Sequence, residues 1–155
     1  MSDDSRRPLP VVDDPETGGF WKATTEHRLV VRVCNACAAK LHLPKSYCHN
    51  CGSWDVRWRD VRPTGSVYSW TVLHHTVHEA FPAPWTVVLV QLDEDPSIRF
   101  IGQLPGAAQL AVGMPMRVRF EDVEPGVTLP QWEPVPASEL RAEQPIESEE
   151  RHGNA

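Results

Sequence analysis

Two closely spaced cysteine pairs constrain this chain more than any other feature. The pairs are Cys34-Asn35-Ala36-Cys37 and Cys48-His49-Asn50-Cys51, with ten residues between them. Each CxxC turn aims two thiolates at one point, and two such turns complete a tetrahedral four-sulfur shell. That shell is typical of closed structural zinc sites. The pattern therefore predicts one structural zinc ion bound by Cys34, Cys37, Cys48 and Cys51.

A four-thiolate shell also suits a single redox iron, which would make the chain an electron carrier. Zinc is the preferred interpretation, because nothing else in the sequence indicates an electron donor or acceptor. Four protein ligands leave no open coordination position, so this zinc is expected to stabilise a small segment and not to activate water. His42 and His49 lie near the cysteines. With four thiolates available, both are expected to be exposed to solvent and not to bind the metal.

Composition limits the classes of partner. The chain has 155 residues and a formal net charge of −6, which argues against a general nucleic-acid or anionic-membrane binder. No apolar run approaches the roughly 20 residues of a membrane span, and the first residues have no signal-peptide core. We therefore expect a cytoplasmic protein. Cytosolic thiols are kept reduced, so the cysteines are expected to bind metal and not to form disulfides.

Hydrophobic periodicity predicts a mainly β protein with one short helical segment near the N-terminus. The helix is expected over residues 20–27. Strands are expected over residues 29–33, 55–61, 66–75, 85–92, 98–104, 116–120 and 129–133, separated by Gly- and Pro-containing turns. Short strands with little helix favour a small closed barrel, because closure removes exposed strand edges. A five-stranded OB-like barrel fits these lengths, with an SH3-like barrel or a sandwich as alternatives.

The same patterns divide the chain into five parts. Residues 1–19 are rich in Pro, Asp, Ser and Gly and are expected to be disordered. Residues 20–32 form the helical segment and a lead-in strand, residues 33–57 the zinc ribbon, and residues 58–135 the barrel. The acidic tail, residues 136–155, has too little apolar content to fold alone and is expected to be disordered.

The run His74-His75-Thr76-Val77-His78-Glu79 is the most prominent cluster of titratable residues outside the cysteines. It matches neither HExxH nor HxxEH, and the following Ala-Phe-Pro-Ala-Pro indicates a loop. We interpret it as a polar strand end and loop at the barrel mouth, in preference to a catalytic or metal site. The sequence has no GxSxG, P-loop or Rossmann glycine pattern. An independent active site is therefore not predicted.

The tryptophans at positions 21, 54, 58, 70, 85 and 132 could form a platform on which bases stack, as in many OB-folds. Core packing or a protein interface is the preferred interpretation, because the strand pattern buries some of them and the chain lacks a basic funnel. Arg57, Arg59 and Arg62 could form a small basic patch near the junction of ribbon and barrel, although a solvated face is favoured.

Several strings together resemble the acyl-CoA-associated zinc-ribbon/OB-fold protein family. They are Phe20-Trp21, Leu29 to Cys37, Leu43-Pro44-Lys45 before the second cysteine pair, Gly65 to Val72, Pro84 to Asp93, Ile101 to Leu104, and Val112 to Val118. The order of these strings is much more specific than the cysteine spacing alone. The sequence departs from the family pattern at Ala38, where Gly is common, at Lys45, where Arg is usual, and at Trp85, where Tyr is usual.

The resemblance implies a short N-terminal helical segment, a rubredoxin-like zinc ribbon and a five-stranded OB-fold barrel. It also implies the small partner of a thiolase-like enzyme or, in some members, of an enoyl-CoA hydratase-like enzyme. We therefore expect a non-catalytic accessory subunit of a hetero-oligomer that docks on a thiolase or retro-aldolase, including enzymes of steroid side-chain degradation. It could also line the acyl-CoA channel of that enzyme.

Candidate contacts with the partner or with acyl-CoA are His74, His75, His78 and Trp85. The basic patch of Arg57, Arg59 and Arg62 could attract a CoA phosphate. The change from Tyr to Trp at position 85 removes a hydroxyl, which weakens the transfer of a ligand contact to that position. A nucleic-acid-binding zinc-ribbon/OB-fold module remains the alternative function.

Overall fold

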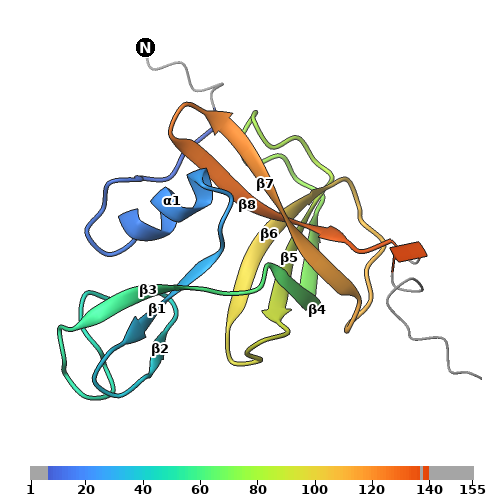
Figure 1. The fold of residues 1–155 in the computed structure, drawn as a ribbon. Coiled ribbons are helices and arrows are strands. Elements are labelled where there is room, and N and C mark those ends of the chain that lie inside the picture. Colours follow the sequence, from blue (N-terminus) through green and yellow to red (C-terminus); the bar gives the residue numbers. More distant parts are fainter. Residues whose placement is uncertain (1–6, 137, 140–155) are drawn as a thin grey trace, which may run out of the picture.

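The computed structural model describes residues 7–136 and 138–139, so the expectations for residues 1–6 and 140–155 lie outside the described residues. Residues 7–19, which were also expected to be disordered, follow a described path that leads into the first helix. One helix, α1 (Gly18–Thr25), precedes eight strands (Figure 1). The strands are β1 (Val30–Cys34), β2 (Lys40–Leu41), β3 (Val56–Asp60), β4 (Thr64–Leu73), β5 (Trp85–Leu92), β6 (Arg99–Pro105), β7 (Pro115–Glu124) and β8 (Val127–Pro134). They form two separate antiparallel sheets.

The first sheet is the zinc ribbon, with strand order β2-β1-β3. The β-branched run before the first cysteine forms β1, as predicted, and pairs with β3 from Val30 opposite Asp60 to Cys34 opposite Val56. β3 runs across the expected boundary between the zinc ribbon and the barrel, which was placed between residues 57 and 58. The alternating residues of β3 therefore belong to the ribbon sheet, and the barrel begins with the next strand.

The second sheet contains five strands in the order β6-β5-β4-β7-β8. β4 has ten residues, and its register against β5 shifts between Val67 and Ser69, which bends the strand. The barrel closes between β6 and β8 without a backbone ladder, through a bond from the Gln103 N–H to Gln131 Oε1 of 2.8 Å. A five-stranded, partly open barrel of this kind is consistent with an OB-fold. The expected fold class is therefore confirmed.

One hydrophobic core joins the ribbon to the barrel. Alternate residues of β5 face inward and are fully buried, as a period of two requires. The core cluster consists of Leu29, Val31, Val33, Val61, Val67, Val88, Val90, Leu92, Ile98, Phe100, Leu104, Met116 and Trp132. Because β1 contributes Val31 and Val33 to this cluster, the ribbon does not fold around its metal alone.

The helix begins at Gly18, two residues before the predicted start, and ends at Thr25. The earlier start follows from Asp14, whose carboxylate accepts the backbone N–H groups of Glu16 and Thr17 at 2.7 and 2.9 Å. This Asx-type turn directs the chain into the helix ahead of the apolar residues that the periodicity detects.

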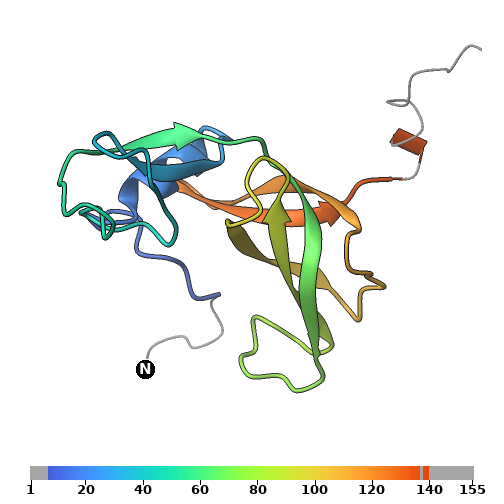
Figure 2. The ribbon, with the colours of Figure 1, turned by 90° about the horizontal axis from the view of Figure 1, so that it is seen from below.

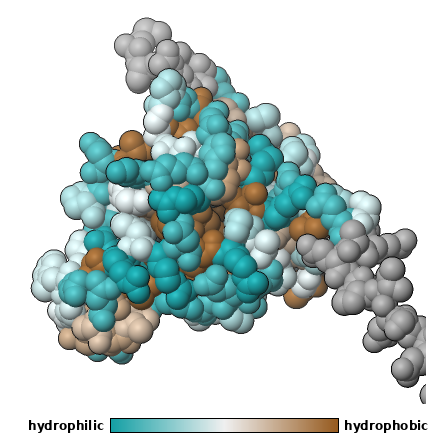
Figure 3. All heavy atoms as spheres, viewed as in Figure 1, coloured by the Kyte–Doolittle hydropathy of each residue, from teal (hydrophilic) through white to brown (hydrophobic). Residues whose placement is uncertain are grey.

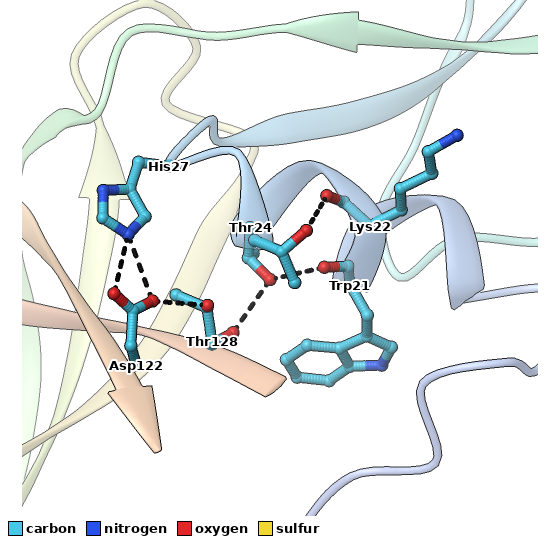
Figure 4. A network of polar contacts seen from close by, with 7 residues as sticks. Trp21, Lys22, Thr24, His27, Asp122 and Thr128 are labelled. Atoms are coloured by element: carbon cyan, nitrogen blue, oxygen red, sulfur yellow. Dashed lines mark hydrogen bonds and ion pairs between the residues drawn. The ribbon is translucent and has the colours of Figure 1, made fainter. Parts of the chain in front are cut away.

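Polar contacts attach the end of α1 to the β7–β8 hairpin (Figure 4). Thr24 Oγ1 donates to the carbonyl oxygen of Thr128 at 2.8 Å, and Thr24 is fully buried. His27 Nε2 lies 3.1 Å from Asp122 Oδ1, and Thr128 Oγ1 donates to the same oxygen at 2.6 Å. The bond from Thr128, together with the one from His27, lowers the pKa of Asp122. The carboxylate therefore stays ionised and keeps both bonds.

The ribbon also contacts the β5–β6 loop of the barrel (Figure 2). Arg59 of β3 forms an ion pair with Glu94 at 2.8 Å, and Lys40 of β2 forms one with Asp95. The Lys40 ammonium, followed by the Ser97 hydroxyl, lowers the pKa of Asp95 to about 2. These pairs hold the ribbon against one end of the barrel.

Candidate functional site

The four cysteines converge at one point of the ribbon. All four Sγ atoms lie within 4.8 Å of one another, and they form the one group of metal-ligating side chains that the described part of the chain brings together. The Sγ atoms are 3.6 Å apart in each of the pairs Cys34–Cys51 and Cys37–Cys48. A tetrahedron with Zn–S bonds of about 2.3 Å has edges of about 3.8 Å. The cluster therefore fits a four-thiolate zinc ion.

Each cysteine pair forms a tight turn. The Ala38 N–H donates to the Cys34 carbonyl oxygen at 3.0 Å, and the Gly52 N–H donates to the Cys48 carbonyl oxygen at 2.8 Å. Both donors have left-handed backbone conformations, with φ of 59° at Ala38 and 75° at Gly52. The second turn thus has the glycine that this conformation favours, and the first has alanine in the same place.

Asn50 supports the thiolate form of one ligand. Its side-chain N–H donates to Cys37 Sγ at 3.5 Å. This bond, followed by one from the Ala39 backbone, lowers the pKa of Cys37 from its ordinary value to about 6. Because the thiolate and not the thiol is the metal ligand, this bond favours metal binding at Cys37.

The two histidines near the cysteines differ in their surroundings. His49 is exposed, as expected. His42 was also expected to be exposed, and this expectation is wrong, because His42 is half-buried between ribbon and barrel. Its Nε2–H donates to the Arg99 carbonyl oxygen at 2.6 Å, its ring lies 4.6 Å from that of Phe100, and burial lowers its pKa.

A large apolar pocket lies where the N-terminal segment, α1 and the ribbon face the outer side of β5 and β6. Its volume is about 770 Å³, within the range of small-molecule sites in proteins. Figure 3 shows the face seen in Figure 1, where apolar side chains gather in the middle between hydrophilic ones. Aromatic walls come from Phe20, Trp21, Trp58, Phe81 and Trp85, and aliphatic ones from Val30, Val31, Leu41, Leu43, Val87, Leu89, Ile101 and Leu129.

The barrel wall of the pocket exists because β5 is apolar on both faces. Its inward residues fill the core, while Trp85, Val87 and Leu89 point outward and line the pocket. Ile101 of β6 stands opposite Leu89, and its side chain is 69% exposed. Leu43, on the ribbon wall, is 74% exposed. Such contiguous exposed apolar side chains mark a binding surface more often than a solvated face.

Three arginines and no acidic residue line the pocket within the described chain. Arg7 forms an ion pair with Glu121 at 2.9 Å. The Arg32 guanidinium lies 5.2 Å from the centre of the Trp58 ring, and that of Arg99 lies 3.8 Å from the centre of the Tyr68 ring. Neither Arg32 nor Arg99 pairs with a carboxylate among the described residues. The Nε atoms of both are buried without a hydrogen-bond partner.

The edge of β6 that faces β8, where no backbone ladder closes the barrel, borders the same pocket. The Gln103 N–H on this edge bonds to Gln131, and the Arg99 carbonyl oxygen accepts from His42. Backbone groups alternate between the two edges of an antiparallel strand. The N–H and C=O of Ile101 therefore point toward this edge too, where no described residue bonds to them.

The pocket contains one of the four predicted contact residues. Trp85 lines it and stacks on Phe81 at a ring distance of 5.6 Å. His78 lies outside the lining, with its ring 5.9 Å from that of Phe81, and its Nδ1 accepts the Ala80 N–H at 3.1 Å. His74 and His75 are exposed in the loop between β4 and β5, outside the pocket lining. The contact roles of all four remain predictions.

The six tryptophans do not share one face. Trp21, Trp58 and Trp85 line the pocket, Trp132 is buried in the core, and Trp54 is 73% exposed beside Tyr47. In the predicted basic patch, the Arg59 guanidinium is paired with Glu94, and the backbone N–H of Arg62 donates to the same carboxylate. Part of that patch is therefore neutralised.

Sequence reasoning missed the pocket as a site. Its signal was present in Trp85 to Leu92, where seven of the eight residues are apolar or threonine, so no polar face remains for solvent. A strand that is apolar on both faces needs a second cover. No such pattern indicated Arg32 or Arg99, which come from different sheets.

The fold and the cysteine cluster together define a zinc-ribbon/OB-fold protein. Two family models match it in succession: the ChsH2 rubredoxin-like zinc ribbon domain over residues 21–57, and the ChsH2 C-terminal OB-fold domain over residues 58–121. The chain belongs to this ChsH2 family, which confirms the resemblance seen in the sequence.

Relatives and solved structures agree with this assignment. The chain is 37% identical over 137 residues to a Thermomonospora curvata protein named "Probable enoyl-CoA hydratase alpha subunit", covering 86% of this chain and 42% of the relative. It is 30% identical over 121 residues to the 3-oxo-4,17-pregnadiene-20-carboxyl-CoA hydratase alpha subunit of Mycobacterium tuberculosis, covering 77% and 38% respectively. The chain thus spans about two fifths of the length of these relatives.

Among solved structures, the chain is similar to one in the Ltp2-ChsH2(DUF35) aldolase. The TM-score is 0.72 and the identity 35%, and the match covers 83% of this chain and 98% of that one. A DUF35-family protein of unknown function from Sulfolobus solfataricus matches with a TM-score of 0.54 and 13% identity. That match covers 78% of this chain and 86% of the other. The second likeness shows the fold alone. No helix in the described part is long and apolar enough to cross a membrane.

Proposed function

We propose that this chain is a non-catalytic, zinc-containing accessory subunit that docks on a thiolase-like acyl-CoA enzyme, either a thiolase or a retro-aldolase. A role in steroid side-chain degradation is part of the proposal, as is a contribution to the wall of the acyl-CoA channel. The single observation that best supports it is the match to a chain of the Ltp2-ChsH2(DUF35) aldolase, which is covered over 98% of its length.

The chemistry of the site supports an accessory role. The four thiolates fill the coordination shell of a zinc ion, so the metal would fix the two turns and leave no position for substrate. The described pocket lining contains no carboxylate, and His42, its one histidine, donates its Nε2–H to the Arg99 carbonyl oxygen. The chain can instead contribute a surface that positions the substrate in the partner enzyme. Positioning of a bound substrate contributes several kcal/mol to catalysis.

Four cysteines are proposed as the ligands of one structural zinc: Cys34, Cys37, Cys48 and Cys51. When bound, the metal would supply only a rigid cross-link between the two turns. Asn50 would then hold one thiolate, and the buried Cys34 and Cys48 would anchor the metal to β1 and to the small ribbon core. Metal analysis separates this proposal from the iron alternative, since a colourless protein with one zinc per chain excludes redox iron.

A native pull-down with mass spectrometry tests the accessory role. The tagged full-length chain should recover a thiolase-like enzyme, and that enzyme should lose activity when the chain is omitted. Cys48→Ser is the matched control, because it removes a buried ligand of the ribbon and should abolish recovery. Repeated recovery of no acyl-CoA enzyme would contradict the proposal. Recovery of RNA-processing proteins would favour the nucleic-acid alternative.

A further inference from the structure

We infer that the pocket between the ribbon and the outer face of β5 and β6 is itself a binding site for an apolar organic acid. The ligand would have a rigid aliphatic or fused-ring body and one anionic group. This inference goes beyond the proposed function and does not rest on it, because it concerns the isolated chain. Three observations carry it: the size and lining of the pocket, its charge, and the open edge of β6.

The lining selects the body of the ligand. A volume of about 770 Å³ is large enough for a drug-sized molecule, and the walls are mostly aromatic and aliphatic. Ile101 and Leu43 remain 69% and 74% exposed on opposite walls. Burial of such side chains by an apolar body favours binding. A fully polar ligand would gain nothing from these walls.

The charges select the anionic group. Arg32 lies on the ribbon wall and Arg99 on the barrel wall, and neither is paired with a carboxylate in the described chain. Their Nε–H groups are buried without an acceptor. These Nε atoms are closed to a ligand as they are to water, so the two positive charges themselves would attract the anion. A carboxylate in the pocket would form charge-assisted hydrogen bonds with the Nη groups, whose charge no described carboxylate compensates. Each guanidinium also lies over an aromatic ring, and Arg32 Nη1 donates to the Glu16 carbonyl oxygen at 3.1 Å, so these contacts hold the charges beside the pocket before a ligand arrives.

The edge of β6 supplies a neutral hydrogen-bonding position between these charges. The backbone of Ile101 presents an N–H and a C=O toward the pocket edge, flanked by Arg99 and Gln103, whose backbone groups on this edge bond to His42 and Gln131. One carbonyl or hydroxyl of a ligand can occupy this gap. A long peptide strand cannot, because the neighbouring positions are already bonded. A small molecule therefore fits the edge better than an added strand.

Displacement of a fluorescent dye tests the inference on the zinc-loaded full-length chain. The probe is 1-anilinonaphthalene-8-sulfonate, which combines an aromatic body with one sulfonate. The competitors are lithocholate, palmitate, the uncharged methyl ester of lithocholic acid, and CoA alone. We expect saturable dye binding and displacement by lithocholate or palmitate. Because an ionic hydrogen bond contributes about 1.5–3 kcal/mol, the methyl ester should bind at least about tenfold more weakly.

Matched variants place the site. Ile101→Glu puts a negative charge on an exposed pocket side chain, and Val112→Glu puts the same charge on a side chain that is 74% exposed outside the pocket lining. Only the first should abolish binding. Arg32→Gln and Arg99→Gln should each weaken lithocholate about tenfold and leave the methyl ester unchanged. Arg57→Gln, an exposed arginine of β3 outside the lining, should change neither affinity.

Several results would overturn the inference. They are the absence of saturable binding in a chain with an intact thermal transition, equal affinity for the acid and its methyl ester, and unchanged binding by Ile101→Glu. Displacement by CoA alone as effective as that by lithocholate would show that the arginines recognise a phosphate, and would also overturn it. None of these outcomes depends on a partner enzyme, so failure here and failure of the docking proposal are distinguishable.

Discussion

The backbone of Ala38 stores strain at the first cysteine pair. Its φ of 59° lies in the left-handed region, and the equivalent residue of the second pair is Gly52, with φ of 75°. A left-handed conformation costs a residue with a Cβ roughly 1–2 kcal/mol. The sequence alone showed that alanine replaces the usual glycine here. It could not show that the turn keeps its left-handed backbone despite the replacement.

Ala38→Gly should therefore stabilise the zinc-loaded protein by about 0.5–1 kcal/mol, because the relief of strain exceeds the extra entropy of glycine in the unfolded chain. Gly52→Ala is the reciprocal variant and should destabilise by a similar amount. Nothing beyond its chain neighbours lies within 4 Å of the added Cβ, so the cost comes from the left-handed backbone alone. Denaturant unfolding at saturating zinc measures both. Loss of stability in both variants would show that Ala38 is not strained.

Gly19 is a second position where one atom decides the outcome. A Cβ built on Gly19 would lie 2.0 Å from Nε1 of Trp58. Alanine normally stabilises a helix interior relative to glycine by about 0.5–1 kcal/mol. Here Gly19→Ala should instead destabilise by about 1–3 kcal/mol, because the helix must move away from the ribbon.

Gly18→Ala is the matched control in the same helix, with its closest contact at 3.2 Å from the Val12 carbonyl oxygen. It should cost less stability than Gly19→Ala in urea unfolding. The tryptophan emission of the folded protein should shift only in Gly19→Ala, because that substitution displaces Trp58. Equal effects of the two substitutions would mean that the helix packs less tightly on Trp58 than the structure indicates.

At the scale of elements, periodicity predicted every strand of the barrel to within a few residues. β5 has the predicted bounds, because an apolar run between Pro84 and an acidic loop can be read directly. The start of α1 was missed because Asp14, not the apolar pattern, begins the turn. The pocket was missed because its walls come from segments whose approach depends on tertiary contacts. The cysteine cluster was predictable because two local turns determine it.

The contacts between the ribbon and the β5–β6 loop should act as coupled pairs. A double-mutant cycle on Lys40 and Asp95 should give a coupling free energy of up to about 1 kcal/mol. The coupling should be equal at pH 8 and pH 5.5. The pKa of Asp95 is about 2 in the folded chain, below its ordinary value, so the stabilisation is lost only as the pH falls below that ordinary value toward 2.

Unfolding monitored by circular dichroism at the two pH values measures this coupling. A cycle on Arg28 and Asp60, an exposed ion pair that includes no residue of the β5–β6 loop, serves as the comparison. A coupling between Lys40 and Asp95 that disappears already at pH 5.5 would contradict the ionisation state assigned to Asp95.

At the scale of the whole molecule, the shared core makes metal binding a property of the entire fold. Val31 and Val33 of the ribbon pack in the same cluster as Val88, Val90 and Trp132 of the barrel. A ribbon that unfolded alone would expose one side of the barrel core. Metal and barrel should therefore unfold together, in the manner of small domains whose metal-binding energy contributes to folding.

Zinc removal by a chelator should lower the thermal midpoint of the whole chain and leave a single transition. Calorimetry and tryptophan fluorescence, to which the buried Trp132 of the barrel contributes, should report the same midpoint. Readdition of zinc should restore it, while magnesium, which prefers oxygen ligands, should not. Two separate transitions after chelation, with the barrel midpoint unchanged, would show that the two parts fold independently.

The edge of β6 has a final consequence, for behaviour at high concentration. A strand edge with unbonded amides is a template for aggregation. On this edge His42 covers the Arg99 carbonyl and Gln131 covers the Gln103 amide. Pro105, two residues after Gln103, belongs to the same edge of β6 and pairs with Trp85 across the sheet. Because proline has no N–H, this edge has one donor fewer. Only the backbone N–H and C=O of Ile101 are left to bond a strand from another molecule. A single residue is too short a template for a fibril. The chain should therefore tolerate storage without a partner better than the exposed apolar wall beside that edge would suggest.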